Sequence, residues 1–381
     1  MATSVDLLQD SAVKSISGLY IHIPFCFHKC HYCDFYSIVE TSGRQEHFLE
    51  RMLSEWRSVR GRWPGGLRTI FVGGGTPTLL PATLWRRLLE GLGRDLDFST
   101  LDEFTVEANP ETVDRPLLSV LVRGGVGRLS IGCQSFDSKH LQTLERKHDP
   151  RSVGRAVALA REAGIGRINL DLIFAIPGQS LEDWKRDLDR TIELQPDHIS
   201  CYGLTYEPNT PMTQKLHRGR IRPAEQELEA AMFEWAIDRL EEAGFRQYEI
   251  SNFARPGAEC LHNLLYWTNG DWFALGPGAA GHLGGVRWKN VPHLGRYLAT
   301  EGGCPVQETE RLDEQGRIGE RLMLGLRLRE GLEMSQTQLG PERQRKVERW
   351  IGRGWMARSG DRIRLTPEGM LQADSILADL I

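Results

Sequence analysis

Strand-like and helix-like segments alternate six times between residues 18 and 202, and this alternation restricts the fold more than any other feature of the sequence. Short apolar runs predict strands at 18–23, 68–72, 103–108, 128–131, 167–173 and 198–202. Helices are predicted between them at 43–60, 81–92, 114–123, 138–145 followed by 151–163, and 180–193. Strands that are separated by helices pair in parallel, so the pattern predicts an α/β fold with helices covering a parallel sheet. Six units are fewer than the eight that close a full barrel.

The alternation stops after residue 202. A loop is predicted at 208–222, a long helix at 224–243, and an irregular stretch rich in glycine and aromatic residues at 249–290. Beyond about residue 305 the pattern is mostly helical, with a short hairpin-like piece at 361–366. Because 381 residues exceed one ordinary core, we expect three regions: a core domain at 1–215, a connecting region at 216–300, and a small, mostly helical C-terminal domain at 301–381.

Composition narrows the function classes. The net charge of −4 does not suggest a nucleic-acid-binding protein. Seven cysteines, an odd and scattered set, favour a reducing compartment and hence a cytoplasmic location. The polar start at 1–17 has no apolar segment typical of a secretory signal, and there is no apolar run long enough to predict a membrane span.

Cys26, Cys30 and Cys33 form the densest chemical motif, directly after the first predicted strand. Three thiolates in one short loop can hold a metal centre, and iron–sulfur clusters are held by cysteine thiolates. Three ligands on a four-iron cluster would leave one iron open to a further ligand. A structural zinc site using a nearby histidine (His22, His28 or His31) and three unrelated thiols are the alternatives that the spacing leaves open.

Polar residues at predicted strand ends form a second set of candidates. Gly74, Gly75 and Thr76 lie in the turn GGGTPT after the second strand, where backbone N–H groups could receive a carboxylate, although such a turn is also a common tight connection. Acidic residues within apolar strands are costly without a partner or ligand, which singles out Glu107 and Asp171. Pairing with neighbouring arginines or helix capping would explain them equally well.

The stretch HNLLYW at 262–267 and the aromatic and glycine run that follows it form a third candidate region. Trp267, Trp272, Phe273 and Leu275 could line an apolar, plate-shaped slot, and His262 or His282 could ligate a haem iron. A hydrogen-bonded core histidine is the alternative. The remaining cysteines show no metal-binding spacing and are expected to be buried thiols: Cys133, Cys201, Cys260 and Cys304.

The cysteine spacing C-x3-C-x2-C, with Tyr32 before the last cysteine, resembles that of the radical S-adenosylmethionine (SAM) family. The resemblance implies a partial (β/α)6 barrel, a [4Fe–4S] cluster on the three cysteines, and SAM bound to its open iron. It assigns SAM-binding roles to eight matching residues: Tyr20, Gly74, Gly75, Thr76, Glu107, Gln134, Arg146 and Asp171.

The longer string YIHIPFC…KC.YCDF resembles the branch that contains oxygen-independent coproporphyrinogen III oxidases and haem chaperones. The oxidases carry a further cysteine where this chain has Phe35, and HNxxYW resembles a motif of the chaperones. The resemblance therefore favours a haem chaperone without oxidase activity, with haem and acceptor haemoproteins as partners. An oxidase that decarboxylates porphyrinogen propionates stays open as the alternative, and a homodimer and peripheral membrane association are compatible with either.

Overall fold

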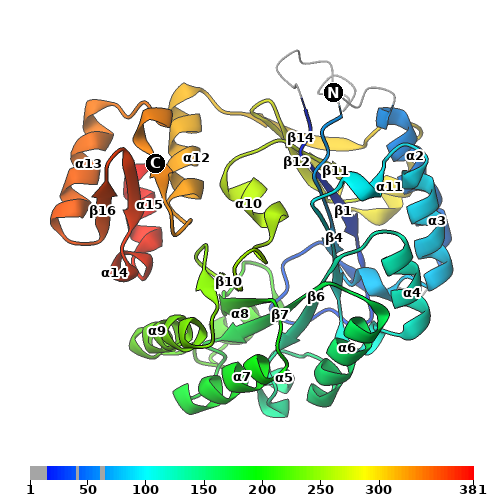
Figure 1. Ribbon diagram of the computed structural model, residues 1–381, viewed down its shortest axis with the longest axis horizontal. Helices are drawn as coiled ribbons and strands as arrows, with labels where there is room; N and C mark the ends of the chain where they lie inside the picture. Colours follow the sequence, from blue (N-terminus) through cyan, green and yellow to red (C-terminus); the bar gives the residue numbers. More distant parts are fainter. Residues whose placement is uncertain (1–14, 40–42, 61–64) are drawn as a thin grey trace.

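The computed structural model describes residues 15–39, 43–60 and 65–381. Most of the polar start, on which the expectation of no secretory signal rests, therefore lies outside the described residues. The six predicted parallel strands are confirmed and are neighbours in chain order, as Figure 1 shows. They are β1 (Gly18–Ile23), β4 (Thr69–Gly74), β5 (Glu103–Ala108), β6 (Arg128–Gln134), β7 (Arg167–Phe174) and β8 (His198–Gly203).

The helices between these strands cover one face of the sheet (Figure 1). They are α2 (Gln45–Arg60), α3 (Ala82–Gly93), α4 (Arg115–Arg123), α5 (Ser138–Thr143), α6 (Pro150–Ala163) and α7 (Leu181–Glu193). Side-chain N-caps begin four of them, including a capping box between Ser180 and Asp183 on α7. Helix α5 ends at Thr143, two residues before the predicted end at 145, and Arg146 lies in the connection to α6.

The sheet is larger than the sequence pattern predicts. It has twelve strands among the described residues, in the order β14-β13-β12-β11-β1-β4-β5-β6-β7-β8-β10-β9. The added strands are β9 (Arg246–Gln247), β10 (Asn252–Ala254), β11 (Trp272–Leu275), β12 (Ala280–Leu283), β13 (Val286–Asn290) and β14 (Val306–Arg311). The prediction of an irregular stretch at 249–290 was therefore wrong, because short strands interrupted by glycine turns give too few alternating residues to be recognised.

Three helices follow β8 before the C-terminal region: α8 (Pro211–His217), α9 (Gln226–Glu242) and α10 (Leu261–Trp267), with α11 (Leu294–Ala299) after β13. Helix α9 confirms the predicted long helix. Helix α8 contradicts the predicted loop at 208–222; Thr210 caps its N-terminus and Pro211 occupies its first position, a start signal that the sequence analysis did not use.

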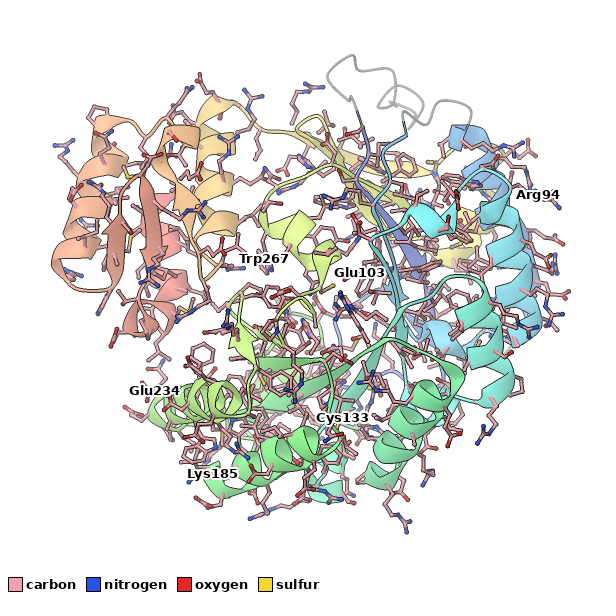
Figure 2. All side chains as sticks on the ribbon, viewed as in Figure 1. Arg94, Glu103, Cys133, Lys185, Glu234 and Trp267 are labelled. Atoms are coloured by element: carbon pink, nitrogen blue, oxygen red, sulfur yellow. The ribbon has the colours of Figure 1, made fainter. Side chains whose placement is uncertain are left out.

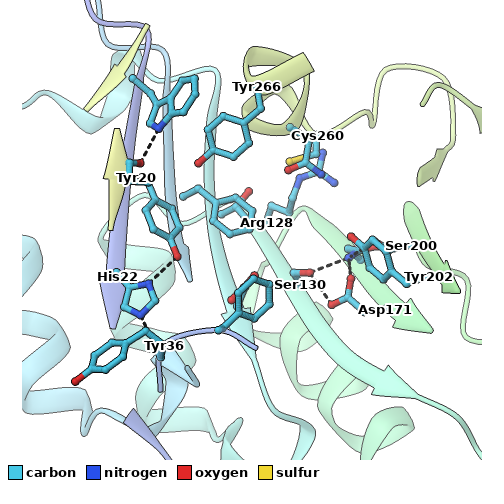
Figure 3. Close-up of a pocket in the computed structure, with 18 of the residues that line it drawn as sticks. Tyr20, His22, Tyr36, Arg128, Ser130, Asp171, Ser200, Tyr202, Cys260 and Tyr266 are labelled. Carbon is cyan, nitrogen blue, oxygen red and sulfur yellow. Dashed lines mark hydrogen bonds between the residues drawn. The ribbon is translucent and has the colours of Figure 1, made fainter. Parts of the chain in front are cut away.

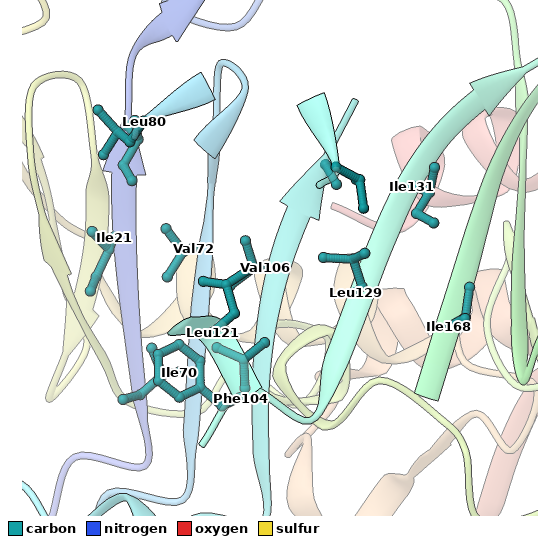
Figure 4. Packing of buried hydrophobic residues seen from close by; sticks show 14 of the residues in the cluster. Ile21, Ile70, Val72, Leu80, Phe104, Val106, Leu121, Leu129, Ile131 and Ile168 are labelled. Atoms are coloured by element: carbon teal, nitrogen blue, oxygen red, sulfur yellow. The ribbon is translucent and has the colours of Figure 1, made fainter. Parts of the chain in front are cut away.

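Strand alternation separates an apolar face from a polar face. On β1, β4, β5 and β6 every second residue packs under the helices; examples are Ile21, Val72, Val106 and Leu129, which Figure 4 shows within one continuous core. The residues between them point to the opposite face, which lines the interior of the curved sheet. That interior face carries Tyr20, Phe71, Glu107, Ser130 and Asp171.

The C-terminal region has its own hydrophobic core, built around residues such as Leu322, Val347, Ile363 and Ile376. It combines α12 (Glu314–Gly325), α13 (Pro341–Gly352), α14 (Pro367–Met370) and α15 (Ala373–Leu380) with a three-stranded sheet of β15 (Leu332–Glu333), β17 (Arg362–Leu365) and β16 (Met356–Ser359). The expected mostly helical C-terminal region is thus present, beside α10 in Figure 1. Within the described part of the chain, no helix is long and apolar enough to cross a membrane.

Candidate functional site

The three-cysteine loop begins where β1 ends. Two short strands, β2 (Phe25–Cys26) and β3 (Ile38–Val39), pair in parallel and close the loop at its base. The Thr76 hydroxyl donates to Cys26 Sγ at 3.8 Å, and Arg146 Nη1 donates to Cys30 Sγ at 3.6 Å. Two of the sulfurs therefore contact the turn after β4 and the segment after α5, at the edge of the sheet where α/β folds carry their chemistry.

The chemistry of these thiols fits a cationic cluster. Burial raises the pKa of Cys26, and burial raises the pKa of Cys33 to about 11, so thiolate formation here needs a strong positive partner. Across the described residues no three His, Cys, Asp or Glu side chains converge closely enough to hold one metal ion. In a four-iron cube each thiolate would bind a different iron.

The glycine turn after β4 docks the cysteine loop. Gly75 N–H donates to Ile23 O at 2.8 Å and Thr76 N–H donates to Phe25 O at 2.7 Å, while Gly74 N–H donates to Glu107 Oε2 at 3.1 Å. A Cβ at position 75 would lie 2.6 Å from Phe25 O, so glycine permits this close approach. The N–H groups expected to receive a ligand carboxylate are thus already bonded within the chain.

Glu107 and Asp171 are two half-buried acids on the interior face of the sheet, Glu107 near the end of β5 and Asp171 within β7. Glu107 accepts from Gly74, and Asp171 accepts from Ser130 Oγ at 3.1 Å and from Asn169 Nδ2 at 2.8 Å (Figure 3). Burial, and then the nearby Asp171 charge, raise the pKa of Glu107 to about 7; burial also raises the pKa of Asp171. Among the described residues neither acid forms an ion pair, and both line the same cavity, so a cationic or hydroxyl-bearing ligand there could bind both.

These groups line one cavity of about 540 Å³. Of the predicted cluster and SAM residues, all but Tyr20 line it: Cys26, Cys30, Cys33, Gly74, Gly75, Thr76, Glu107, Gln134, Arg146 and Asp171. Gln134 has a φ of 65°, which holds it in the left-handed region at the end of β6. Arg146 also donates to Gly132 O at 3.0 Å, an approach that a side chain at position 132 would block. We call this the cysteine cavity.

A second cavity of about 530 Å³ lies inside the curved sheet, and we call it the barrel cavity. Tyr20 lines it together with Phe71, Tyr266 and Trp272, so one side is aromatic (Figure 3). The two cavities share a wall of six residues: Asp34, Phe35, Glu107, Ser130, Asp171 and Tyr202. A ligand in one cavity therefore lies next to a ligand in the other.

The HNLLYW stretch forms α10 and delivers Asn263 and Tyr266, but not His262, to the barrel cavity. His262 is fully buried; Thr69 Oγ1 and Tyr266 Oη lie 2.8 and 2.9 Å from its two ring nitrogens. Burial lowers its pKa to about 3. Haem ligation by His262 would therefore require the loss of one of these hydrogen bonds.

His282 on β12 keeps one ring nitrogen free. Its Nδ1 lies 2.8 Å from Gly270 O and must donate to it, which leaves the Nε2 lone pair without a hydrogen bond in the part of the chain that the structure describes. The expected slot residues are divided: Trp272 lines the barrel cavity, Phe273 and Leu275 lie in the core under the helices, and Trp267 packs against Arg327. The four remaining cysteines are buried thiols, as predicted.

Sequence analysis missed a row of polar residues on the interior face of the sheet. Glu103, Arg128, Asn169, His198 and Ser200 all occupy every-second positions of their strands. Of these, Arg128, Asn169, His198 and Ser200 line the barrel cavity. The usable signal was polar residues alternating with Ile, Leu and Phe in strands that should otherwise be buried on both faces.

Residues 20–191 match the Radical SAM superfamily, and residues 312–371 match the HemN C-terminal domain. The fold is similar to that of coproporphyrinogen III oxidase (HemN) from Escherichia coli, with a TM-score of 0.85, 22% identity, and coverage of 99% of this chain and 92% of that one. The fold and the cysteine cavity therefore define a protein of the radical SAM class.

Sequence similarity narrows this class. The heme chaperone HemW of Bacillus subtilis (strain 168) is 39% identical over 83% of this chain and 85% of its own length. The heme chaperone HemW of Lactococcus lactis subsp. lactis (strain IL1403) is 37% identical over 83% of each chain. The chain belongs to the HemW family of radical SAM proteins, which confirms the family resemblance.

Proposed function

We propose that this protein is a haem chaperone, which binds haem and transfers it to acceptor haemoproteins with the help of a [4Fe–4S] cluster and SAM. The observation that carries the proposal is the shared wall between the cysteine cavity and the aromatic barrel cavity. The names of the relatives, heme chaperone HemW, support the haem partner.

Membership of the radical SAM superfamily implies the cluster and SAM. Cys26, Cys30 and Cys33 would be the cluster ligands, and the cysteine cavity would hold SAM on the remaining iron. SAM carries a positive sulfonium, and the half-buried acids Glu107 and Asp171 offer the negative charge that such a ligand needs. The other residues proposed to contact SAM are Tyr20, Gly74, Gly75, Thr76, Gln134 and Arg146, with the glycines acting by close approach because their N–H groups are occupied.

Haem would occupy the barrel cavity, whose volume lies within the usual range for bound small molecules. The rings of Tyr20, Phe71, Tyr266 and Trp272 offer flat apolar surfaces to a planar ligand. Neither histidine lines the barrel cavity, but His282 is the better candidate iron ligand, because a histidine that donates from Nδ1 to a carbonyl and keeps Nε2 free has the usual arrangement of a metal ligand. His282 also packs against Trp272, with ring centroids 5.2 Å apart.

Coproporphyrinogen oxidation is not part of the proposal. Phe35 stands where the oxidases have a further cysteine, and its side chain is 63% exposed in the wall that separates the two cavities. The similarity to coproporphyrinogen III oxidase at 22% identity concerns the fold alone. A cytoplasmic location completes the proposal.

Anaerobic assays on the cluster-reconstituted protein separate the two functions. We expect a Soret band on titration with haem, and movement of that haem to an apo-haemoprotein mixed with the loaded chaperone. With coproporphyrinogen III, SAM and a reductant, we expect no protoporphyrinogen IX. Efficient conversion would refute the chaperone assignment, and Phe35→Cys serves as the variant that restores the oxidase residue at this position.

A further inference from the structure

A chain of hydrogen bonds joins the start of α10 to Asp171 across the interior face of the sheet. Cys260 N–H donates to Tyr248 Oη at 3.4 Å, and Tyr248 Oη lies 2.9 Å from His198 Nε2. His198 Nδ1 lies 2.6 Å from Asn169 Oδ1, and Asn169 Nδ2 donates to Asp171 Oδ1 at 2.8 Å. Asn169 and His198 are buried, so water does not compete with these bonds.

The chemistry of the groups decides which member of each hydrogen bond is the donor. An ionised Asp171 only accepts, so the amide nitrogen of Asn169 must face it and the amide oxygen must face His198. His198 Nδ1 then carries the hydrogen. Burial lowers the pKa of His198 well below its usual value, so the ring is neutral and Nε2 accepts from the Tyr248 hydroxyl. Every donor along the chain therefore points toward the carboxylate.

The chain orients Asp171 as well as supporting its charge. Asn169 Nδ2 also donates to Ser130 Oγ at 2.7 Å, and Ser130 Oγ donates to Asp171 Oδ2 at 3.1 Å. Both carboxylate oxygens are thus held from the β6 and β7 side, inside the sheet (Figure 3). Their remaining lone pairs are open to the cysteine cavity, where they can accept from a ligand that donates, such as one bearing hydroxyl or amino groups.

We propose that Asn169 and His198 are positioning residues, which hold Asp171 as an oriented acceptor for the hydrogen-bond-donating groups of SAM. The inference rests on the proposed SAM site in the cysteine cavity. It assigns a role to two residues that line the barrel cavity only and that would otherwise be read as parts of the haem compartment.

The test compares SAM dissociation constants of cluster-reconstituted variants, measured by equilibrium binding. His198→Leu removes the donor that orients the Asn169 amide toward Asp171, and we expect it to weaken SAM binding by about tenfold. His198→Asn, whose side-chain amide can replace the Nδ1 donor, should recover most of that loss. Tyr248→Phe, one bond further from the carboxylate, should have a smaller effect. Thr105→Val is the matched control, because Thr105 is buried beside the barrel cavity and its Oγ1 makes no hydrogen bond among the described residues.

The pH profile distinguishes positioning from damage to the fold. When the donors are removed, Asp171 should take up a proton more readily, so SAM binding by His198→Leu should recover as pH rises, whereas a misfolded site should not. The ionisable groups around Asp171 are Glu107, Arg146, His198, Tyr202, Cys133 and Cys201. The Glu107→Gln background removes the neighbouring acid whose pKa is also raised by burial.

The outcomes separate this inference from the proposed function. If the parent protein does not bind SAM, or if Asp171→Ala binds it as tightly as the parent, the SAM site itself is wrong. If Asp171→Ala weakens binding but His198→Leu and Asn169→Leu behave like Thr105→Val, the positioning role is wrong and the site stands. The inference is supported if His198→Asn binds SAM nearly as tightly as the parent, if Tyr248→Phe weakens SAM binding less than His198→Leu does, and if SAM binding by His198→Leu recovers as pH rises.

Discussion

Glu103→Ala is the substitution for which the structure predicts the largest loss of stability outside the apolar core. Glu103 begins β5 and lies between the sheet and α10 (Figure 2). Its Oε2 lies 3.3 Å from Arg128 Nε, with both side chains only 2% exposed. It also accepts from Leu261 N–H at 2.9 Å, from His262 N–H at 3.2 Å and from the Cys260 thiol at 3.3 Å. One carboxylate therefore binds a buried arginine and holds the first turn of α10.

The expected loss in the free energy of unfolding follows from the groups that the substitution leaves without their partner. Removing one partner of a buried ion pair costs about 3–5 kcal/mol, and loss of a helix N-terminal acceptor costs about 1 kcal/mol. The two losses overlap, so we expect Glu103→Ala to lower the free energy of unfolding by about 4 kcal/mol. In Arg128→Leu the carboxylate keeps its three donors at a helix N-terminus, so we expect about 2 kcal/mol. Arg128 has no such relief, because it stays charged and only its Nη2 has carbonyl acceptors.

Equilibrium unfolding in urea, followed by tryptophan fluorescence and extrapolated to water, measures both losses. Glu103→Gln, which keeps the shape and one acceptor, should fall between the parent and Glu103→Ala. An Arg128→Leu protein that is less stable than Glu103→Ala, or a Glu103→Ala protein within about 1 kcal/mol of the parent, would contradict the energetic ranking.

Three further predictions address the ligands. Cys30→Ser should lose most of its iron and sulfide after reconstitution, measured by metal and sulfide analysis, whereas the buried-thiol control Cys133→Ser should retain both. Burial raises the pKa of the Glu107 carboxyl to about 7, so a ligand cation that pairs with the ionised form should bind more tightly as pH rises from 6 to 8. Below that pKa the affinity should rise by up to about tenfold per pH unit. Glu107→Gln should remove this pH dependence. A steeper profile in the variant than in the parent would count against the pairing. His282→Ala should shift or weaken the Soret band of bound haem more than His262→Ala does, since of these two histidines only His282 has a ring nitrogen without a hydrogen bond among the described residues. A spectroscopic haem titration measures the difference, and the reverse order would indicate that His262 on α10 is the iron ligand.

The parallel core and the cysteine cavity could be predicted from the sequence because their signals are local. Each strand of the core is one apolar run bounded by a helix, and the carboxyl ends of parallel strands meet at one edge of the sheet. Cys26, Gly74 and Glu107 each follow or lie near the end of such a run, so their common location follows from the strand order without any knowledge of distances, whereas Asp171 lies within its strand.

The partners of these residues could not be predicted, because they depend on contacts between positions far apart in the chain. Glu103 holds α10 from 158 residues away, counted to Leu261. His262 looked like a free ligand in the sequence, yet Thr69, from 193 residues away, occupies one of its nitrogens. Hydrogen-bond satisfaction is a property of the packed interior and has no local sequence pattern.

The sequence by itself therefore determined the fold class and singled out residues that the structure gathers in one cavity, because strand–helix alternation and motif spacing are encoded over a few residues. Only the tertiary structure decided how these residues are used: which glycine N–H groups are already bonded, which histidine keeps a lone pair, and which acids are left to a ligand. The physical reason is that burial makes every polar group depend on the neighbours that the fold brings to it, and those neighbours come from distant strands.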